Sequence, residues 1–596
     1  MSYRAPVRDM AFVLQEVAGL GGLSAGGGFA ELTPDLVEAV LEEGAKLAGE
    51  VLAPLNHAAD REGARLEADG VKTPKGFAEA YRRWVDGGWG ALAAAPEYGG
   101  QGLPLALATA MQEMWNAANM SFGLCPILSQ GAIEALTAHG TEEQKRLYLA
   151  RLVSGEWTGT MNLTEPQAGS DLNALKARAV PQGDGTYRIT GTKIFITYGD
   201  HDMADNIVHL VLARLPDAPA GTRGISLFLV PKFLVNPDGS LGARNDVKCV
   251  GLEEKLGIHG SPTCVMSYGD EGGAIGTLIG EENRGLACMF TMMNNARLLV
   301  GTQGVAIAER AYQHALAYAN ERRQGRPAGS DLPPGEMAPI VAHPDVRRML
   351  LTMKSLTAAA RAICYANAVA IDRAHHGADE AAREAGRARA DLLTPIAKSF
   401  STDIGVEVAS IGVQIHGGMG FIEETGAAQY YRDARILPIY EGTNGIQAID
   451  LVTRKLPLGN GAVVRGFIAE MRETAARAQR SNRDDLAAIG SALDKGLDAL
   501  DEATEWMLTR LKSSADDCLA GASPYLRLFG TVAGGHFLAL GALAAAASDG
   551  DGFMQARLAT AGFYAAQQLP LAAGLVGPST AGAGMLYALD AEGLGN

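Results

Sequence analysis

The spacing of apolar residues changes twice along the chain and predicts helices, then strands, then helices again. From Thr33 to about Gly155 the spacing is helical, and the Thr-Pro pair at 33–34 is typical of a helix start. Between residues 184 and 231, short segments rich in β-branched and aromatic residues alternate with turn residues, as strands do. The helical period returns from Asn283, so we expect a β domain between two helical domains.

The helical pattern continues beyond a linker-like stretch at 456–462. There, apolar residues lie on one helix face and continue at the same spacing: Val464, Phe467, Ile468, Met471, Leu486, Ile489, Leu493, Leu497 and Leu500. Residues 1–35, by contrast, include a stretch too rich in glycine for a stable helix. The predicted fold class is α+β and multidomain: an N-terminal arm (1–35), an N-terminal helical domain (36–157), a middle β-barrel or sandwich domain (158–280), a four-helix-bundle domain (281–455) and an additional C-terminal helical domain (461–596).

Composition narrows the class of protein. Of 596 residues, 47% are hydrophobic and 20% are charged, which is typical of a globular chain. The net charge of -16 disfavours a nucleic-acid-binding surface. The six cysteines are scattered without a C-x-x-C pair, which favours reduced thiols over disulfides or a zinc site. The sequence has no secretory pattern and no apolar stretch suited to a membrane span, so we expect a cytoplasmic protein without a membrane partner.

One carboxylate raises a question at residues 436–444, which read ILPIYEGTN. Glu441 stands between an apolar run and a Gly-Thr-Asn turn signal. An acid beside a turn is commonly solvated and idle. Alternatively, the apolar run desolvates Glu441 and makes it a stronger base. Other segments of the chain decide between these two interpretations.

Four further segments carry polar groups in glycine-rich or aromatic surroundings. They are MNLTEPQAGSDL at 161–172, GTKIFITYG at 191–199, YANERRQGRP at 318–327 and VQIHGGMGF at 413–421. Taken singly, they are a turn-rich loop, an amphipathic strand, a solvated run of arginines and a glycine turn. Together, in this order and followed by YEGTNGIQA, they resemble the acyl-CoA dehydrogenase family over residues 35–455.

The resemblance implies bound FAD and no metal. It places hydroxyls and backbone N–H groups of the first segment at the flavin, and an aromatic ring, Phe195, beside it, where many relatives have Trp. It also implies that Arg322 reaches the pyrophosphate of the FAD in a neighbouring subunit, whereas His416 is interpreted as packing. The implied cofactor-binding residues are Met161, Leu163, Thr164, Ser170, Phe195, Thr197, Arg322, Gln324, Gln414, Gly418 and Thr443.

The implied reaction is α,β-dehydrogenation of a saturated acyl-CoA to the trans-2-enoyl-CoA. The α hydrogen leaves as a proton and needs a base, and the β hydrogen leaves as hydride and needs a cofactor. Glu441 is the implied catalytic base. Implied substrate contacts are Ser170, Arg297, Tyr440 and Gly442, although Arg297 is equally interpretable as a helix-surface residue. Gly445 departs from relatives that have Gln at this position.

Substrate and partners stay open at this point. The arm and the additional domain resemble a longer subgroup of the family, which implies 3-(methylthio)propionyl-CoA or another short acyl-CoA. Medium- or long-chain acyl-CoA is an alternative. Another is a DNA-associated alkylation-response flavoprotein, although residues 461–596 carry 10 Lys and Arg against 15 Asp and Glu. The implied partners are a second copy in a homodimer and an electron-transferring flavoprotein, with oxygen as the alternative electron acceptor.

Overall fold

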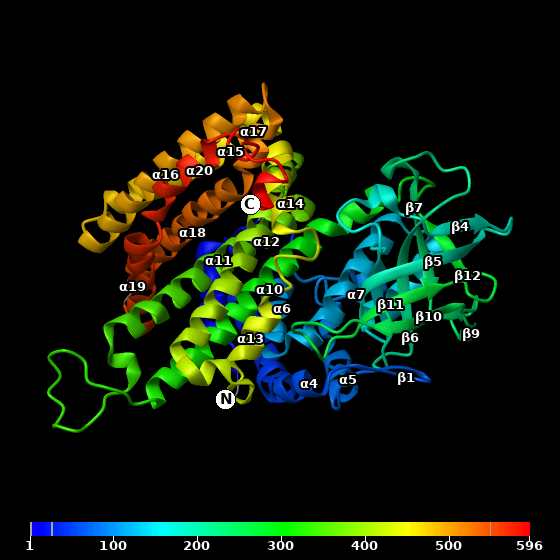
Figure 1. Ribbon diagram of the computed structural model, residues 1–596, viewed down its shortest axis with the longest axis horizontal. Helices are drawn as coiled ribbons and strands as arrows, with labels where there is room; N and C mark the ends of the chain where they lie inside the picture. Colours follow the sequence, from blue (N-terminus) through cyan, green and yellow to red (C-terminus); the bar gives the residue numbers. More distant parts are fainter. Residues whose placement is uncertain (1–2, 26–27, 549, 596) are drawn as a thin grey trace.

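The computed structural model describes residues 3–25, 28–548 and 550–595. A long helical bundle forms the centre, with a β domain at one end and the last helices packed along its other side (Figure 1). The described helices before the β domain are α1 (Val7–Phe12), α2 (Gly21–Ala25), α3 (Pro34–Lys46), α4 (Asn56–Glu62), α5 (Phe77–Asp86), α6 (Leu105–Ala118), α7 (Met120–His139), α8 (Glu142–Gln144) and α9 (Ala150–Ser154).

A local signal predicted the start of α3. The Thr33 hydroxyl accepts a hydrogen bond from the Leu36 N–H at 3.2 Å and begins α3, as the sequence predicts. The helical expectation for the whole stretch up to Gly155 is wrong at one place, because β1 (Arg65–Glu67) and β2 (Gly70–Lys72) form a hairpin. Gly70 has a φ of 127°, which a glycine adopts without strain.

Residues 3–25 are packed against the body of the molecule. Tyr3, Met10 and Leu14 are buried in the same core as the central helices. The expectation that the glycine-rich stretch cannot be helical is wrong for Gly21–Ala25, which forms α2. The neighbouring Leu20 and Leu23 are buried, and this burial outweighs the low helix propensity of glycine.

The β domain contains a closed ring of strands. Strand β5 pairs with β12, β12 with β7, β7 with β6, and β4 pairs with both β6 and β5. The strand segments predicted between 184 and 231 are confirmed, and further short strands follow them. The described strands are β3 (Trp157–Asn162), β4 (Arg178–Pro181), β5 (Thr186–Thr197), β6 (Asn206–Arg214), β7 (Ile225–Pro231), β8 (Phe233–Val235), β9 (Leu241–Arg244), β10 (Val247–Leu252), β11 (Thr263–Tyr268) and β12 (Ala274–Ile279).

Three long helices build the central bundle: α10 (Gly285–Glu321), α11 (Pro344–His376) and α12 (Glu380–His416). The two glycines inside α10 allow α12 to approach closely. A Cβ at Gly301 would lie 2.6 Å from the Ala397 oxygen, and one at Gly304 would lie 2.3 Å from the Ser401 oxygen. The bundle is followed by α13 (Ala427–Ala434) and α14 (Asn444–Asp450).

The additional helices are α15 (Ala462–Gln479), α16 (Asp484–Arg510), α17 (Ala515–Ala520), α18 (Ala522–Ala546), α19 (Gly552–Gln567) and α20 (Leu571–Thr580). The predicted apolar stripe on α15 and α16 is buried, as expected. By length and composition α18 is apolar enough to cross a membrane, but 78% of its most apolar stretch is buried inside the molecule. It packs on the bundle as a core helix, with Gly530 against the Phe400 ring.

A buried arginine ties the two ends of the chain to the bundle. Arg361 on α11 pairs with Asp9 of α1 at 2.7 Å, with Glu113 of α6 at 2.6 Å and with Glu309 of α10 at 2.8 Å. Arg557 of α19 also pairs with Asp9. Because a buried charge without a partner is costly, this cluster fixes α1 and α19 on the bundle.

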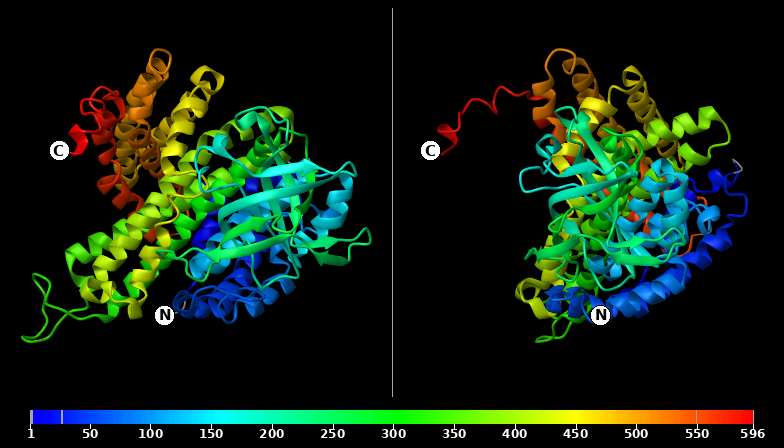
Figure 2. Two further views of the ribbon diagram at one scale, coloured as in Figure 1. Left: turned by 45° about the vertical axis from the view of Figure 1, so that its right-hand side comes forward. Right: turned by 90° about the vertical axis from the view of Figure 1, so that its right-hand side faces the viewer.

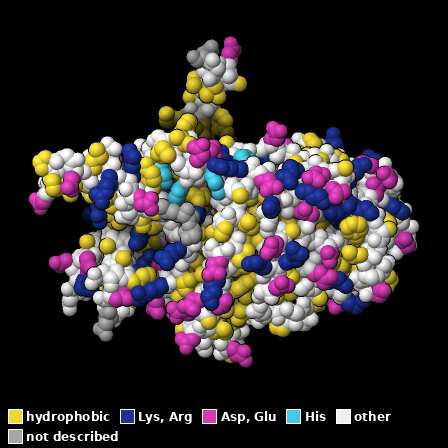
Figure 3. Space-filling view, turned by 90° about the horizontal axis from the view of Figure 1, so that it is seen from below, with side chains coloured by type: hydrophobic (Ala, Val, Ile, Leu, Met, Phe, Trp, Pro, Cys, Tyr) yellow, Lys and Arg dark blue, Asp and Glu magenta, His cyan; other side chains and the backbone are white. Residues whose placement is uncertain are grey.

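The last residues behave differently from the rest of the C-terminal domain. The segment that ends at residue 595 stands away from the body (Figures 2 and 3). Apolar side chains on it are exposed: Met585, Leu586, Tyr587, Leu589 and Leu594. An apolar segment of this kind is typical of a contact with another molecule.

Candidate active site

Glu441 lies in the tight turn between α13 and α14. Its φ is 55°, and that of Gly442 is 83°, so two consecutive residues are left-handed. A Cβ at position 442 would lie 2.8 Å from the Gln447 Nε2, and the positive φ of residue 442 favours glycine there. A left-handed glutamate stores backbone strain of the kind that clusters at functional sites.

The residues after the turn hold it in place. The Thr443 hydroxyl accepts from the Ile446 N–H at 3.2 Å and caps α14. The Asn444 amide donates to the Ser399 carbonyl and the Asp403 carboxylate of α12, at 3.2 and 2.7 Å. The turn is therefore anchored to the middle of the bundle.

Two cations lie close enough to influence Glu441. Burial raises the pKa of Glu441 above its usual value, and the positive charges of Lys398 and Arg297 oppose that rise. Lys398 on α12 is fully buried and donates to the Asn444 Oδ1 at 2.9 Å. Burial lowers the pKa of Lys398 to about 7. A carboxylate in these surroundings suits proton abstraction better than an idle, solvated acid does.

Arg297 is buried beside the same turn. It is 7% exposed and pairs with Asp450 of α14 at 3.3 Å. The alternative of a helix-surface arginine is therefore wrong. Its charge lies close enough to interact with Glu441, and its implied contact with the substrate stays a prediction.

The first two motif segments meet at the edge of the β domain. The Ile194 N–H donates to the Thr164 carbonyl at 3.0 Å, and Lys193 pairs with Glu165 at 2.9 Å in the interior. This buried pair fixes the loop that carries Leu163, Thr164 and Ser170. Next to it, Phe195 has a φ of 59° and is 58% exposed.

These residues fit the edge and face of a flavin ring. The hydroxyls of Thr164, Ser170 and Thr197 have no hydrogen-bond partner within the described residues, so they are free to bind a ligand. Met161, at the end of β3, packs beside Gly131 of α7, at 3.5 Å from the position of a Cβ there. Met292 of α10 lies 3.7 Å from the same Cβ position at Gly131. Because Arg297 is also on α10, this helix extends from the edge of the β domain to Arg297.

A second group of predicted cofactor residues lies elsewhere. Arg322 and Gln324 follow the end of α10 and bond each other at 3.1 Å, and Gln414 and Gly418 lie exposed at the end of α12. At about 1.5 Å per residue, α12 spans roughly 24 Å between Lys398 and Gln414. The single chain thus places its predicted FAD contacts in two separate groups.

The interpretation of His416 as packing is confirmed. Its ring stacks on Tyr318 at 4.4 Å between centroids, and it is buried. Sequence reasoning missed Lys398, Gln447 and the Glu165–Lys193 pair. A signal for Lys398 was available, since it interrupts the otherwise apolar stretch PIAKSF inside a predicted helix.

Comparison with known proteins gives a consistent result. In chain order, the segments match the descriptions "Acyl-CoA dehydrogenase, N-terminal domain" (36–156), "middle domain" (160–270), "C-terminal domain" (283–456) and "Acetyl-CoA dehydrogenase C-terminal like" (467–590).

Individual relatives cover nearly the whole chain. A 3-methylmercaptopropionyl-CoA dehydrogenase of Ruegeria pomeroyi is 50% identical over 96% of each chain. A broad-specificity linear acyl-CoA dehydrogenase of Mycobacterium tuberculosis is 33% identical over 96% of each chain. The crystal structure of a Bacillus anthracis acyl-CoA dehydrogenase complexed with FAD has the same fold, with a TM-score of 0.75 and 20% identity over 94% of this chain and 90% of that one. The chain belongs to the acyl-CoA dehydrogenase family, whose members are FAD-dependent oxidoreductases acting on the CH–CH bond of acyl-CoA.

Proposed function

We propose that Glu441 is the catalytic base and that the substrate is a short acyl-CoA, with 3-(methylthio)propionyl-CoA as the first candidate. The observation that carries the base assignment is the strained, desolvated carboxylate flanked by Lys398 and Arg297. The substrate assignment is supported by the name of the relative that is 50% identical along nearly the entire chain.

The turn offers two groups to the thioester. The Glu441 carboxylate takes the α proton. Within the described part of the chain, the Glu441 N–H donates to no acceptor, so it is free to donate to the thioester oxygen and to stabilise the enolate that forms. Gly442 and Tyr440 flank this N–H, which supports their assignment as substrate contacts. Proton abstraction and oxyanion stabilisation thus come from one residue.

When bound, FAD supplies the acceptor for the β hydride. Thr164, Ser170, Thr197 and Phe195, with Met161 and Leu163, would hold its ring. Thr443 caps α14 through its hydroxyl oxygen and still has a proton to donate. These side chains are uncharged, so they orient the ring without adding a charge.

We also propose a homodimer in which the second residue group completes the cofactor site of the partner. The support is the separation of Arg322, Gln324, Gln414 and Gly418 from the ring-binding edge, together with the exposed apolar segment before residue 595. Sedimentation of the FAD-loaded protein is expected to give a dimer. A flavin-saturated monomer would refute this arrangement.

Longer acyl chains and DNA are the competing ligands. The M. tuberculosis relative is named for linear acyl-CoA of broad specificity, which keeps longer chains in competition. The excess of acidic residues at 461–596 disfavours DNA. By resemblance, the electron acceptor is an electron-transferring flavoprotein.

The deciding measurement is anaerobic bleaching of the flavin by a series of acyl-CoA thioesters. We expect the fastest bleaching with 3-(methylthio)propionyl-CoA and butyryl-CoA, and slower bleaching as the chain lengthens. Fastest bleaching by the longest thioester would contradict the short-chain proposal. No bleaching by any thioester would contradict the proposed function as a whole.

A further inference from the structure

A chain of buried side-chain amides runs from the catalytic turn into the helical core. The Tyr440 hydroxyl, next to Glu441, donates to the Gln303 Oε1. The Gln303 Nε2 donates to the Asn116 Oδ1 at 3.0 Å, and the Asn116 Nδ2 donates to the main-chain carbonyl of Gln112 at 2.8 Å. Gln303 is 0% exposed, Asn116 1% and Gln112 8%. This series of hydrogen-bonded amides therefore runs from the turn through α10 to α6 without reaching solvent.

A glycine on the neighbouring helix α7 leaves space for one of these amides. A Cβ at Gly123 of α7 would lie 2.6 Å from the Asn116 Oδ1 and 2.7 Å from its Cγ. Only glycine leaves room for the amide plane between α6 and α7. The amide position is thus specified by a second residue that makes no hydrogen bond to it.

Buried amides are costly unless they are paired, and when paired they hold side chains in one geometry. Gln303 and Asn116 lie in a region that would otherwise be apolar core, between helices rich in Leu, Met and Ala. The paired amides therefore form a rigid polar boundary beside Tyr440.

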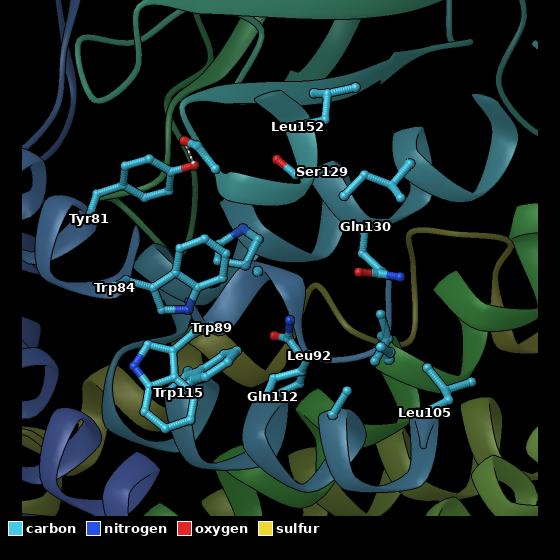
Figure 4. A pocket seen from close by; sticks show the side chains of 17 residues that line it. Tyr81, Trp84, Trp89, Leu92, Leu105, Gln112, Trp115, Ser129, Gln130 and Leu152 are labelled. Atoms are coloured by element: carbon cyan, nitrogen blue, oxygen red, sulfur yellow. Dashed lines mark hydrogen bonds between the residues drawn. The ribbon is translucent and has the colours of Figure 1, made fainter. Parts of the chain in front are cut away.

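Beside this boundary lies a cavity (Figure 4). Its lining includes Gln112, Trp84 and Trp115, and also Leu299, which lies one helical turn before Gln303 on α10. The indole N–H groups of Trp84 and Trp115 are buried without a hydrogen-bond partner. The space has room for about two water molecules. Gln112 lines the cavity and accepts from Asn116, so the series of amides ends beside this space.

We propose that Gln303 and Asn116 form the inner wall of the acyl chamber and restrict the substrate to short acyl chains. This inference rests on the proposed function, because it assumes that the α carbon lies at Glu441. The CoA part must leave toward solvent, so the acyl end points inward along α7 and α10, toward Tyr440 and Gln303.

The Gln303→Ala variant removes one amide and enlarges the proposed chamber at its inner end. One additional methylene in a fitted apolar pocket changes kcat/KM by roughly 10-fold to 200-fold. The volume freed by removing the amide should move the preferred acyl chain to longer lengths. We expect the ratio of kcat/KM for octanoyl-CoA to that for butyryl-CoA to rise by at least about 10-fold.

The experiment measures kcat/KM and anaerobic bleaching for thioesters from butyryl-CoA to dodecanoyl-CoA, and for 3-(methylthio)propionyl-CoA. It compares the FAD-loaded wild type with Gln303→Ala, Asn116→Ala and the matched control Gln130→Ala, which also lines the cavity but lies outside the amide chain. The expected result is a longer optimum in the first two variants and an unchanged one in the control.

The outcomes distinguish failure of the wall proposal from failure of the proposed function. A wild type that bleaches with butyryl-CoA, together with a Gln303→Ala variant of unchanged chain-length profile, refutes the wall and leaves the function standing. A wild type that already prefers dodecanoyl-CoA also refutes the wall. If Gln303→Ala loses FAD, the Gln303→Ser variant, which also shortens the side chain but keeps a polar group, is tested for flavin spectral shifts on adding unreactive alkyl-CoA thioethers. Tighter binding of long thioethers by this variant supports the wall, and unchanged binding refutes it.

Discussion

Replacing Glu441 with glutamine is expected to leave a yellow, FAD-loaded protein that substrate no longer bleaches. Loss of a positioned general base typically costs 10²-fold to 10⁴-fold, and we expect the rate of flavin reduction to fall by roughly 10³-fold or more. Glutamine has nearly the same shape, so the left-handed turn and its glycine neighbour remain. The measurement is stopped-flow absorbance of the flavin under anaerobic conditions.

Binding should separate from chemistry in this variant. The backbone N–H of residue 441 and the Tyr440–Gln303 hydrogen bond do not depend on the carboxylate. Spectral titration with substrate should therefore give a Kd within a few-fold of the wild-type value. The matched control is Glu424→Gln, an exposed acid on the preceding loop, which should bleach normally. Normal bleaching by the Glu441→Gln variant would reject the assignment of the base.

Local features of the sequence were predictable because their causes are local. The cap at Thr33 requires only a hydroxyl beside the first turn, and the stripe on α15 and α16 requires only the helical period. The strand segments of the β domain were found for the same reason. The hairpin at 65–72 was missed because each strand has only three residues, too few for an alternation to be recognised.

Tertiary features were not predictable from pattern alone. The packing of α1 on the bundle involves Arg361, whose partners Asp9 and Glu113 are far apart in the sequence. The motif reasoning proposed Glu441 but gave no reason for its electrostatic surroundings, because Lys398 lies on another helix. A lone lysine in an apolar helix indicates burial but does not reveal which carboxylate it faces.

Lys398 yields the second large effect, on the pH dependence of flavin reduction. Turnover needs ionised Glu441, so the rate rises with pH as this carboxyl loses its proton. Lys398, with Arg297, favours the charged form and lowers the pKa that burial has raised. Removing the Lys398 charge should raise the pKa of Glu441 further. The rising limb of the pH profile then moves to higher pH, and the rate below that limb falls by about 10-fold for each pH unit of displacement.

Three substitutions separate charge from hydrogen bonding. Lys398→Met removes both the charge and the donor to Asn444, Lys398→Gln keeps a donor, and Lys398→Arg keeps the charge. If the charge acts on Glu441, both neutral variants shift the limb upward and arginine restores it. If Lys398 only holds Asn444, glutamine restores the wild-type profile, and the electrostatic role is refuted.

The rising limb of the wild-type pH profile should reflect the titration of two groups, Glu441 and Lys398. Burial lowers the pKa of Lys398 to about 7. The negative charges of Glu441 and Asp403 raise this pKa, and the positive charge of Arg297 lowers it. As the pH rises, Lys398 loses its proton and with it the positive charge that favours ionised Glu441. The deprotonation of Lys398 therefore opposes that of Glu441, and the two are coupled. Because of this coupling, the rising limb of the pH profile is broader than the limb of a single acid. In the Lys398→Met variant, only Glu441 titrates beside Arg297. Its limb should therefore be steeper as well as displaced, a change that lost packing around Asn444 would not produce.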